Sequence, residues 1–163
     1  MPFHCALSAP EAQDRRACAD VEIEDPDDYE YLAMTASGLL AEAGYRFSIG
    51  GFGTEEWDFD VEYDMSTLLE QLPDVRDGLR RGVECEIDLY SQGVERSITF
   101  APSGSAVELR CVSRTSWVPD PGTELHERAT IEAMFDKLAH DVAASLQSVC
   151  PEIAGLSPFR DWR

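Results

Sequence analysis

Carboxylates at every second position are the residues of this chain whose type and spacing could do chemistry. They are Asp58, Asp60, Glu62 and Asp64. On a β-strand these side chains share one face, and carboxylate oxygens are the ligands that Ca²⁺ and Mg²⁺ prefer. Neighbours on one strand face lie roughly 7 Å apart, too far for one ion to collect three of them. We therefore expect no metal site, whereas acid–base catalysis by carboxylates of this face stays open.

Two further motifs could hold or transform a substrate. The glycine-rich turn at residues 50–53 follows an expected strand, as a phosphate-binding loop would. No helix follows it, however, and Glu55 and Glu56 would repel phosphate. His126 and Glu127 lack the second histidine of a zinc protease motif. No serine nucleophile elbow is present and no local signature supports a cysteine nucleophile, so we expect neither catalytic residues nor a cofactor.

Charge is the outlying property of the chain. Its 163 residues include 32 acidic and 13 basic side chains, a formal net charge of −19. Nucleic-acid binding depends on Lys and Arg neutralising phosphates, so a nucleic-acid ligand is not expected. An anionic membrane surface would repel the chain for the same reason. The acid is concentrated: residues 17–64 contain fourteen acidic side chains and a single basic one, Arg46.

Cysteine usage and hydropathy bear on the cellular compartment. The odd number and wide spacing of the cysteines favour reduced core residues over zinc ligands or disulfides. They are Cys5, Cys18, Cys85, Cys111 and Cys150. Residues 1–10 lack the basic start and apolar run of a signal peptide, and no stretch approaches the ~20 apolar residues of a membrane span. We expect a cytoplasmic protein.

The elements that would position the acidic side chains are mostly strands. Trp57–Tyr63 and Val83–Tyr90 both alternate apolar and acidic residues, as half-buried strands do. A hairpin joins the second of these to Val94–Ala101, and Ala106–Val112 follows. Tyr45–Ile49 is a further short strand.

Apolar residues at helical spacing predict the helices. One helix covers residues 28–43, and another begins at Asp64 or Ser66, is interrupted by Pro73 and ends at Gly82. The clearest helix follows a cap at Thr123 and stops at Pro151. Phe135 and Leu138 should be buried in it.

Strands joined by short turns, with helices outside those runs, imply an α+β fold. We expect a mainly antiparallel sheet of about five strands with helices packed on one face. Residues 1–163 fit a single domain. Residues 1–27 are expected to form an irregular N-terminal segment, with at most a short strand at residues 21–23.

Alternation then assigns much of the acid to one surface. If both acidic strands pack their apolar residues on the helices, six carboxylates project from the open side of the sheet: Asp58, Asp60, Glu62, Glu84, Glu86 and Asp88. Glu95 and Glu108 would join them, with Arg110 the only basic residue there. Like charges on neighbouring strands destabilise each other, so a cationic partner would offset the repulsion. A solvated, salt-screened face is the alternative.

These features resemble the immunity proteins with which bacteria neutralise their own toxins. The resemblance rests on the acidic strands Trp57–Tyr63 and Glu84–Asp88, the hairpin Glu86–Phe100 and the closing amphipathic helix. It implies a small acidic α+β protein of the cytoplasm that has no catalytic residues and binds a toxin enzyme.

Three functions follow as hypotheses. In the first, the acidic face binds the basic surface of a toxin, with aromatic anchors at Tyr63, Tyr90 and Trp117. In the second, the chain is a small hydrolase whose carboxylates act as acid and base. In the third, it mimics nucleic acid and blocks a nucleic-acid-binding protein. The sequence leaves the identity of the partner and the oligomeric state open.

Overall fold

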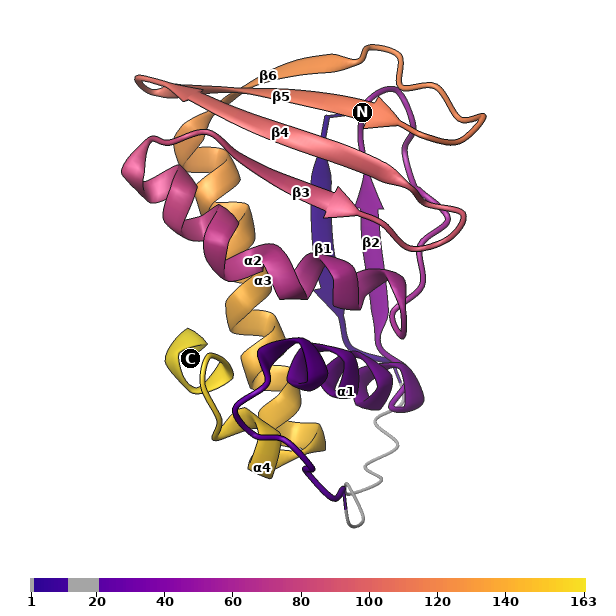
Figure 1. Ribbon diagram of the computed structural model, residues 1–163, viewed down its shortest axis with the longest axis vertical. Helices are drawn as coiled ribbons and strands as arrows, with labels where there is room; N and C mark the ends of the chain where they lie inside the picture. Colours follow the sequence, from indigo (N-terminus) through magenta and orange to yellow (C-terminus); the bar gives the residue numbers. More distant parts are fainter. Residues whose placement is uncertain (1, 12–20) are drawn as a thin grey trace.

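The computed structural model describes residues 2–11 and 21–163. Its strands are β1 (His4–Ser8), β2 (Arg46–Gly50), β3 (Cys85–Leu89), β4 (Arg96–Ser103), β5 (Ala106–Ser113) and β6 (Thr123–Glu127). Its helices are α1 (Tyr29–Glu42), α2 (Asp64–Arg81), α3 (Arg128–Val149) and α4 (Pro151–Ala154), followed by a 3₁₀ turn, η1 (Phe159–Trp162). The strands form two antiparallel sheets, β1–β2 and β3–β4–β5–β6, and the helices described lie on one side of the larger sheet (Figure 1). The predicted α+β fold is confirmed.

Helix α1 begins and ends as the sequence predicts. The side chain of Asp28 accepts a hydrogen bond from the main-chain N–H of Tyr31 and so caps the first turn. The helix ends just before Gly44, whose φ of 83° lies in the left-handed region that glycine adopts without strain. Its buried residues pack toward α2, and they include Leu32, Ala33, Ala36 and Leu40.

Helix α2 continues through Pro73, where we expected an interruption. Proline has no N–H to donate to the carbonyl group four residues earlier, which here belongs to Leu69. The hydroxyl of Tyr29, the first residue of α1, donates a hydrogen bond to that carbonyl oxygen. The predicted break is therefore wrong because a side chain from another helix supplies the missing donor. The end at Gly82, with φ of 68°, is as predicted.

Strands β3, β4 and β5 confirm the predicted meander, with Ile87 opposite Ile98 and Phe100 opposite Leu109. The residues on the inner face of this sheet are buried against the helices: Ile87, Leu89, Ile98, Phe100, Val107 and Leu109. Its outer face carries no helix in the part of the chain described, as Figure 1 shows. The sheet thus has one packed face and one open face.

Strand β6 is not indicated by the sequence pattern, which predicted that Thr123 caps the last helix. The strand pairs with β5, with Leu109 opposite Glu124 and Val107 opposite His126. Its inward positions are therefore polar, and its middle outward residue is Leu125. This is the reverse of the alternation by which a half-buried strand is recognised. Helix α3 begins only after β6, at Arg128.

Strand β1 lies in the segment that we expected to be irregular. Its buried residues Cys5 and Leu7 alternate with exposed or half-buried neighbours, and they pair with Ile49 and Phe47 of β2. The expected strand at residues 21–23 is absent, since those residues have no regular structure. A run of only five residues gives too little alternation to distinguish a strand from an irregular segment.

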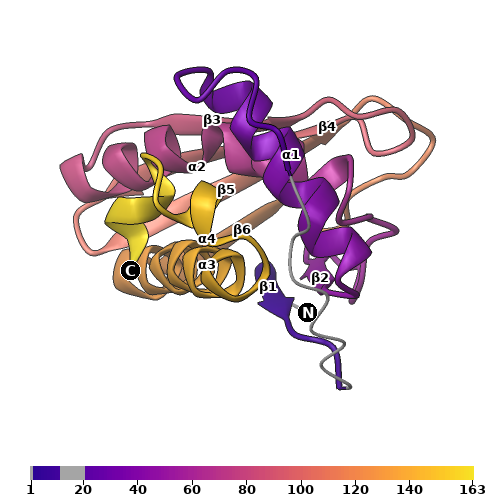
Figure 2. The same cartoon turned by 90° about the horizontal axis from the view of Figure 1, so that it is seen from below.

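The core is built around α3, which contacts β1, α2 and η1 and runs beneath the sheet (Figure 2). The predicted core residues are confirmed, because Phe135 is 0% and Leu138 is 1% exposed. The C-terminal turn closes this core, since Phe159 and Trp162 are both buried.

Four cysteines lie within the described residues, and all four are free thiols: Cys5, Cys85, Cys111 and Cys150. Three are buried and Cys85 is half-buried, which agrees with core packing. Cys18 lies outside the described residues. Among the helices described, none combines the length and apolar character needed to cross a membrane.

Candidate functional site

Residues 58–63 form a loop, so the strand predicted for Trp57–Tyr63 is wrong. Asp60 Oδ1 accepts hydrogen bonds from the main-chain N–H groups of Tyr63 (2.7 Å) and Asp64 (3.1 Å). Asp64 Oδ2 in turn accepts one from the N–H of Asp60 (2.8 Å). This reciprocal capping satisfies N–H groups at the start of α2 and holds the chain out of a β ladder.

The loop explains why the sequence pattern misleads. Phe59 and Val61 pack against the core from the loop. The apolar residues of this alternating run are therefore partly buried without any strand pairing. Asp58 and Glu62 are exposed, but they do not share a sheet face with the carboxylates of β3. Asp60 has a structural role at the helix start.

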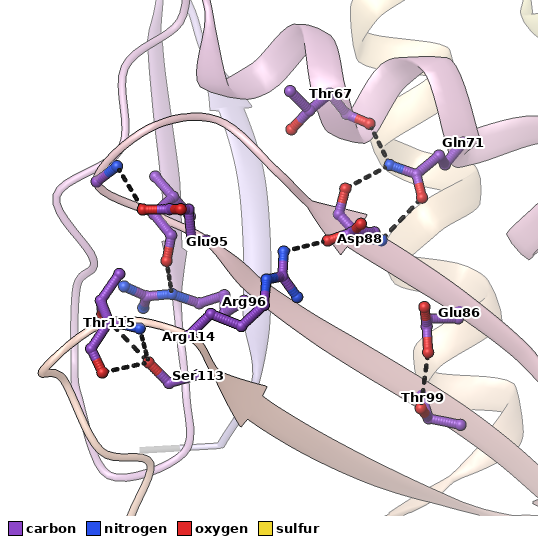
Figure 3. Close-up of polar contacts among 12 residues, drawn as sticks. Thr67, Gln71, Glu86, Asp88, Glu95, Arg96, Thr99, Ser113, Arg114 and Thr115 are labelled. Atoms are coloured by element: carbon purple, nitrogen blue, oxygen red, sulfur yellow. Dashed lines mark hydrogen bonds and ion pairs between the residues drawn. The ribbon is translucent and has the colours of Figure 1, made fainter.

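The start of α2 nevertheless lies beside the end of β3. The hydroxyl of Ser91 donates a hydrogen bond to Asp64 Oδ1 (2.6 Å). Further along the helix, the side chain of Gln71 pairs with the main chain of Asp88: it accepts from the N–H and donates to the carbonyl oxygen, each at 2.8 Å (Figure 3). The loop at residues 58–63 and the acidic strand β3 are thus brought together by α2 and not by a shared sheet.

Glu86 and Asp88 lie on the open face of the larger sheet, as predicted, opposite Thr99 and Ser97 of β4. Glu84 is exposed just before β3. Figure 3 shows that Arg114 reaches Asp88, with a distance of 2.6 Å between Nη2 and Oδ1.

The open face is therefore less uniformly acidic than we expected. Glu108 and Arg110 both project from it and form an ion pair at 2.9 Å. Together with Arg114 this gives the face two basic residues, so the expectation of Arg110 alone is wrong. Glu95 lies in the turn before β4, where its carboxylate accepts a hydrogen bond from the N–H of Gly93 (3.4 Å).

Several carboxylates from α1, α2 and β3 lie around Tyr90 and Tyr29. We call this the acidic patch, and it consists of Glu30, Glu70, Asp74, Asp88 and Tyr90. The hydroxyl of Tyr90 donates a hydrogen bond to Glu70 (2.6 Å). Within the described residues, Arg114 on Asp88 is the only cation paired with it.

The proton affinities in the acidic patch reflect this crowding. Burial raises the pKa of Glu70, and the charge of Glu30 raises it further, although the hydrogen bond from Tyr90 acts in the other direction. The hydrogen bond that Tyr90 donates to Glu70, together with partial burial and the nearby charges of Glu70, Glu30 and Asp88, raises the pKa of Tyr90 to about 12. Each group therefore holds its proton more tightly, and a cation placed here would relieve the repulsion.

The three predicted aromatic anchors differ in exposure. Tyr63 is 62% and Tyr90 is 53% exposed, so both can meet a partner. Trp117 is half-buried: its indole N–H donates to Thr54 Oγ1 (3.1 Å) and its ring packs on Arg96. Trp117 stabilises the fold and does not present its ring as a free anchor.

Arg96 is a site residue that sequence reasoning missed. It is only 6% exposed, and its guanidinium carbon lies 4.5 Å from the ring centroid of Trp57 and 3.9 Å from that of Trp117. Burial lowers its pKa, whereas nearby Cys111 and Asp64 raise it. Cation–π contacts with the two rings, whose planes meet at 63°, compensate for the lost hydration of the charge. No sequence signal marks an arginine at an inward-facing strand position for this role.

The glycine-rich turn is occupied by structural contacts. A side chain added at Gly53 would place Cβ 1.8 Å from the carbonyl oxygen of Asp120. The N–H of Phe52 donates to a Glu124 carboxylate oxygen (2.7 Å), and the other oxygen of Glu124 accepts from the N–H of Phe3 (2.7 Å). The turn thus needs glycine for close approach of the chain, and Glu124 ties it to β6.

No three His, Cys, Asp or Glu side chains of the described residues are arranged to hold a metal ion. Comparisons with protein-family models, with curated proteins and with solved structures found no match.

Proposed function

We propose that this chain is an acidic protein-binding module which inhibits a toxin enzyme with a basic surface, in the manner of bacterial immunity proteins. One observation carries the proposal: Tyr90, 53% exposed, stands among the carboxylates of Glu30, Glu70 and Asp88. At protein interfaces an aromatic side chain can supply affinity, and surrounding charges of one sign can supply selectivity for a partner of opposite charge.

The electrostatic argument favours a cationic partner. Crowded carboxylates repel one another, and Glu30, Glu70 and Asp74 have no ion pair with the described residues. A lysine or arginine from a partner would remove that repulsion while gaining a charge-assisted hydrogen bond. The net charge of −19 would also speed the encounter with a basic surface.

The hydroxyl of Tyr90 adds specificity to this surface. It is oriented by its hydrogen bond to Glu70, so its ring is held in one position before binding. A side chain fixed in advance loses less conformational entropy when a partner docks. The free thiols of the described cysteines agree with a reducing compartment, and we propose the cytoplasm as the place of action.

The test is capture from the native cell followed by an inhibition assay. The wild type should retain a basic enzyme, and adding it at equal concentration should abolish that enzyme's activity. The variant Glu30→Lys with Asp74→Lys should retain little of it, because both side chains are exposed parts of the acidic patch.

Its control is Glu42→Lys with Glu152→Lys, which makes the same charge change at exposed positions outside the acidic patch. The control should capture and inhibit as the wild type does. Equal capture by both variants, or a captured enzyme that stays active, would contradict the proposed function.

A further inference from the structure

Successive residues of β6 point their main-chain N–H and C=O groups alternately toward β5 and away from it. The N–H of Cys111 donates to the carbonyl oxygen of Gly122 (2.9 Å), and that of Arg128 donates to Ser105 (2.8 Å). These bonds bracket β6 and fix its phase against β5, because bonded and non-bonded pairs alternate along an antiparallel ladder. Glu124 and His126 therefore point their main-chain groups at β5, whereas Thr123 and Leu125 point theirs away.

The outward side of β6 is unpaired. Within residues 2–11 and 21–163, the main-chain N–H and C=O groups of Thr123 and Leu125 have no hydrogen-bond partner. In Figure 1 no other ribbon runs along that side of the strand. The opposite edge of the sheet differs, because Gln71 of α2 occupies the corresponding groups of Asp88 in β3. Helix α2 lies along the β3 edge and partly covers it, whereas the β6 edge is unpaired within the described residues.

Side chains at this edge suit an added strand. Leu125 is 75% exposed, an apolar group in the middle of the edge. A cleft of about 360 Å³ runs beside it, lined by β6 itself and by Pro2, Gly53 and Pro121. A strand paired with β6 would place one side chain over Leu125 and the next, on the other face, toward this cleft.

The charges beside β6 select the kind of strand. The basic groups here are already paired: Arg110 with Glu108 (2.9 Å), Arg128 with Glu132 (3.2 Å) and His126 with Glu124 (2.7 Å). Glu127, at the end of β6, and Asp120, in the loop before β6, are exposed and have no ion pair within the described residues. The complementary strand is apolar at its centre and basic at its ends.

We propose that β6 receives an extended basic segment of the partner protein as a fifth strand of the sheet, with Leu125 as the apolar contact and Glu127 as the charged one. This rests on the proposed function only for the positive charge of the partner. Strand addition to an open edge takes its affinity from main-chain hydrogen bonds and its selectivity from alternate side chains.

A synthetic probe tests the edge directly. The probe is a capped peptide of about nine residues with the sequence Thr-Lys-Thr-Val-Thr-Val-Thr-Lys-Thr. In ¹⁵N-labelled protein, adding the peptide should slow exchange of the Leu125 amide hydrogen at least about tenfold, since that N–H becomes hydrogen-bonded. A peptide with glutamate in place of lysine should bind at least about tenfold more weakly.

Two variants separate main-chain pairing from apolar contact. Leu125→Pro removes the outward N–H while leaving the ladder to β5 intact, as edge strands allow, and it should weaken peptide binding at least about tenfold. Leu125→Thr keeps the N–H and should weaken it only a few-fold. Unchanged Leu125 exchange in the wild type at millimolar peptide would overturn the proposal even if Leu125→Pro failed to fold.

The remaining outcomes also decide it. A dimer of the free wild type that Leu125→Pro disperses would assign the edge to a second copy of this chain and overturn the proposal. If the captured enzyme binds Leu125→Pro as it binds the wild type, strand addition is wrong and the proposed function stands. If reversal of the acidic patch leaves capture unchanged, the proposed function fails, and the peptide result still decides what β6 does.

Discussion

The hydroxyl of Tyr29 donates a hydrogen bond to the main-chain carbonyl oxygen of Leu69. That carbonyl would have no donor otherwise, because Pro73 stands four residues later in α2 and has no N–H. The bond therefore joins α1 to α2 at the turn of α2 where Pro73 supplies no main-chain N–H. It also places Tyr29 and Pro73 at the border between the acidic patch and the cleft formed with the C-terminal segment.

The bond between Tyr29 and the Leu69 carbonyl predicts that changes at Tyr29 and Pro73 are coupled in a double-mutant cycle. Tyr29→Phe should lower the free energy of unfolding by about 1–3 kcal/mol, since the Leu69 carbonyl loses its partner. In a Pro73→Ala background, the N–H of the new alanine can make the helical bond, so the same tyrosine change should cost clearly less. Urea denaturation of the four proteins gives the coupling energy. Equal costs in both backgrounds would mean that the two residues act independently.

Glu124 should make stability depend on acid pH. Burial raises its pKa, but the hydrogen bonds from Phe3, Phe52 and His126 together outweigh burial and hold the pKa below its ordinary value of 4.5. A lowered folded-state pKa contributes stability that is present above 4.5 and is lost as pH falls through the folded value.

Glu124→Gln should therefore be less stable than the wild type by about 1–3 kcal/mol at neutral pH, because an amide nitrogen cannot accept the bonds that a carboxylate oxygen accepts. The difference should narrow as pH falls below 4.5, where the wild-type carboxylate gains a proton. Chemical denaturation across that range measures it. A difference independent of pH would contradict this role for the ionised side chain.

Glu70 should make stability depend on pH in the opposite direction. Burial and the charge of Glu30 raise its pKa above 4.5, so its contribution to stability is fully present below 4.5 and is lost as pH rises through the folded value. Glu70→Gln keeps an acceptor for the Tyr90 hydroxyl and should be more stable than the wild type at neutral pH. The gain should shrink in high salt and vanish in acid. A loss of stability at neutral pH would show that the ionised form is favourable here.

Arg96 should depend on its planar shape as well as its charge. Arg96→Lys keeps the charge but loses the planar guanidinium that contacts the rings of Trp57 and Trp117, so we expect a loss of about 1–2 kcal/mol in the free energy of unfolding and a shift in tryptophan fluorescence. Arg110→Lys is the matched control, since Arg110 is exposed and pairs only with Glu108, and it should change stability by less than about 0.5 kcal/mol. Equal losses of stability in Arg96→Lys and Arg110→Lys would contradict a stabilising contact of Arg96 with the two tryptophan rings.

Most elements follow from local patterns that tertiary structure does not override. The capped start of α1, the buried stripe of α3 and the alternation in β3 each need only neighbouring residues to be read. The failures are non-local. No local signal shows that Tyr29 would repair the helix at Pro73, or that β5 would pair with a strand whose inward positions are Glu124 and His126.

Only the negative charge of the candidate site could be predicted from the sequence. Acid on β3 follows from alternation, and Glu86 and Asp88 lie on the open face as expected. The acidic patch around Tyr90 joins residues from α1, α2 and β3, whose proximity depends on how the helices pack. Asp60 shows the other limit, because a carboxylate at strand-like spacing serves as a cap when the chain turns into a helix.

The most direct test of the central claim is the rate at which the acidic patch associates with the captured basic enzyme, measured by surface plasmon resonance at low and high salt. Glu30→Lys with Asp74→Lys should slow association at low salt by about tenfold or more and reduce its salt dependence, because these charges steer the encounter. Glu42→Lys with Glu152→Lys should keep most of the wild-type rate. An association rate at low salt that is the same for the wild type and the Glu30 and Asp74 variant would contradict recognition by this surface.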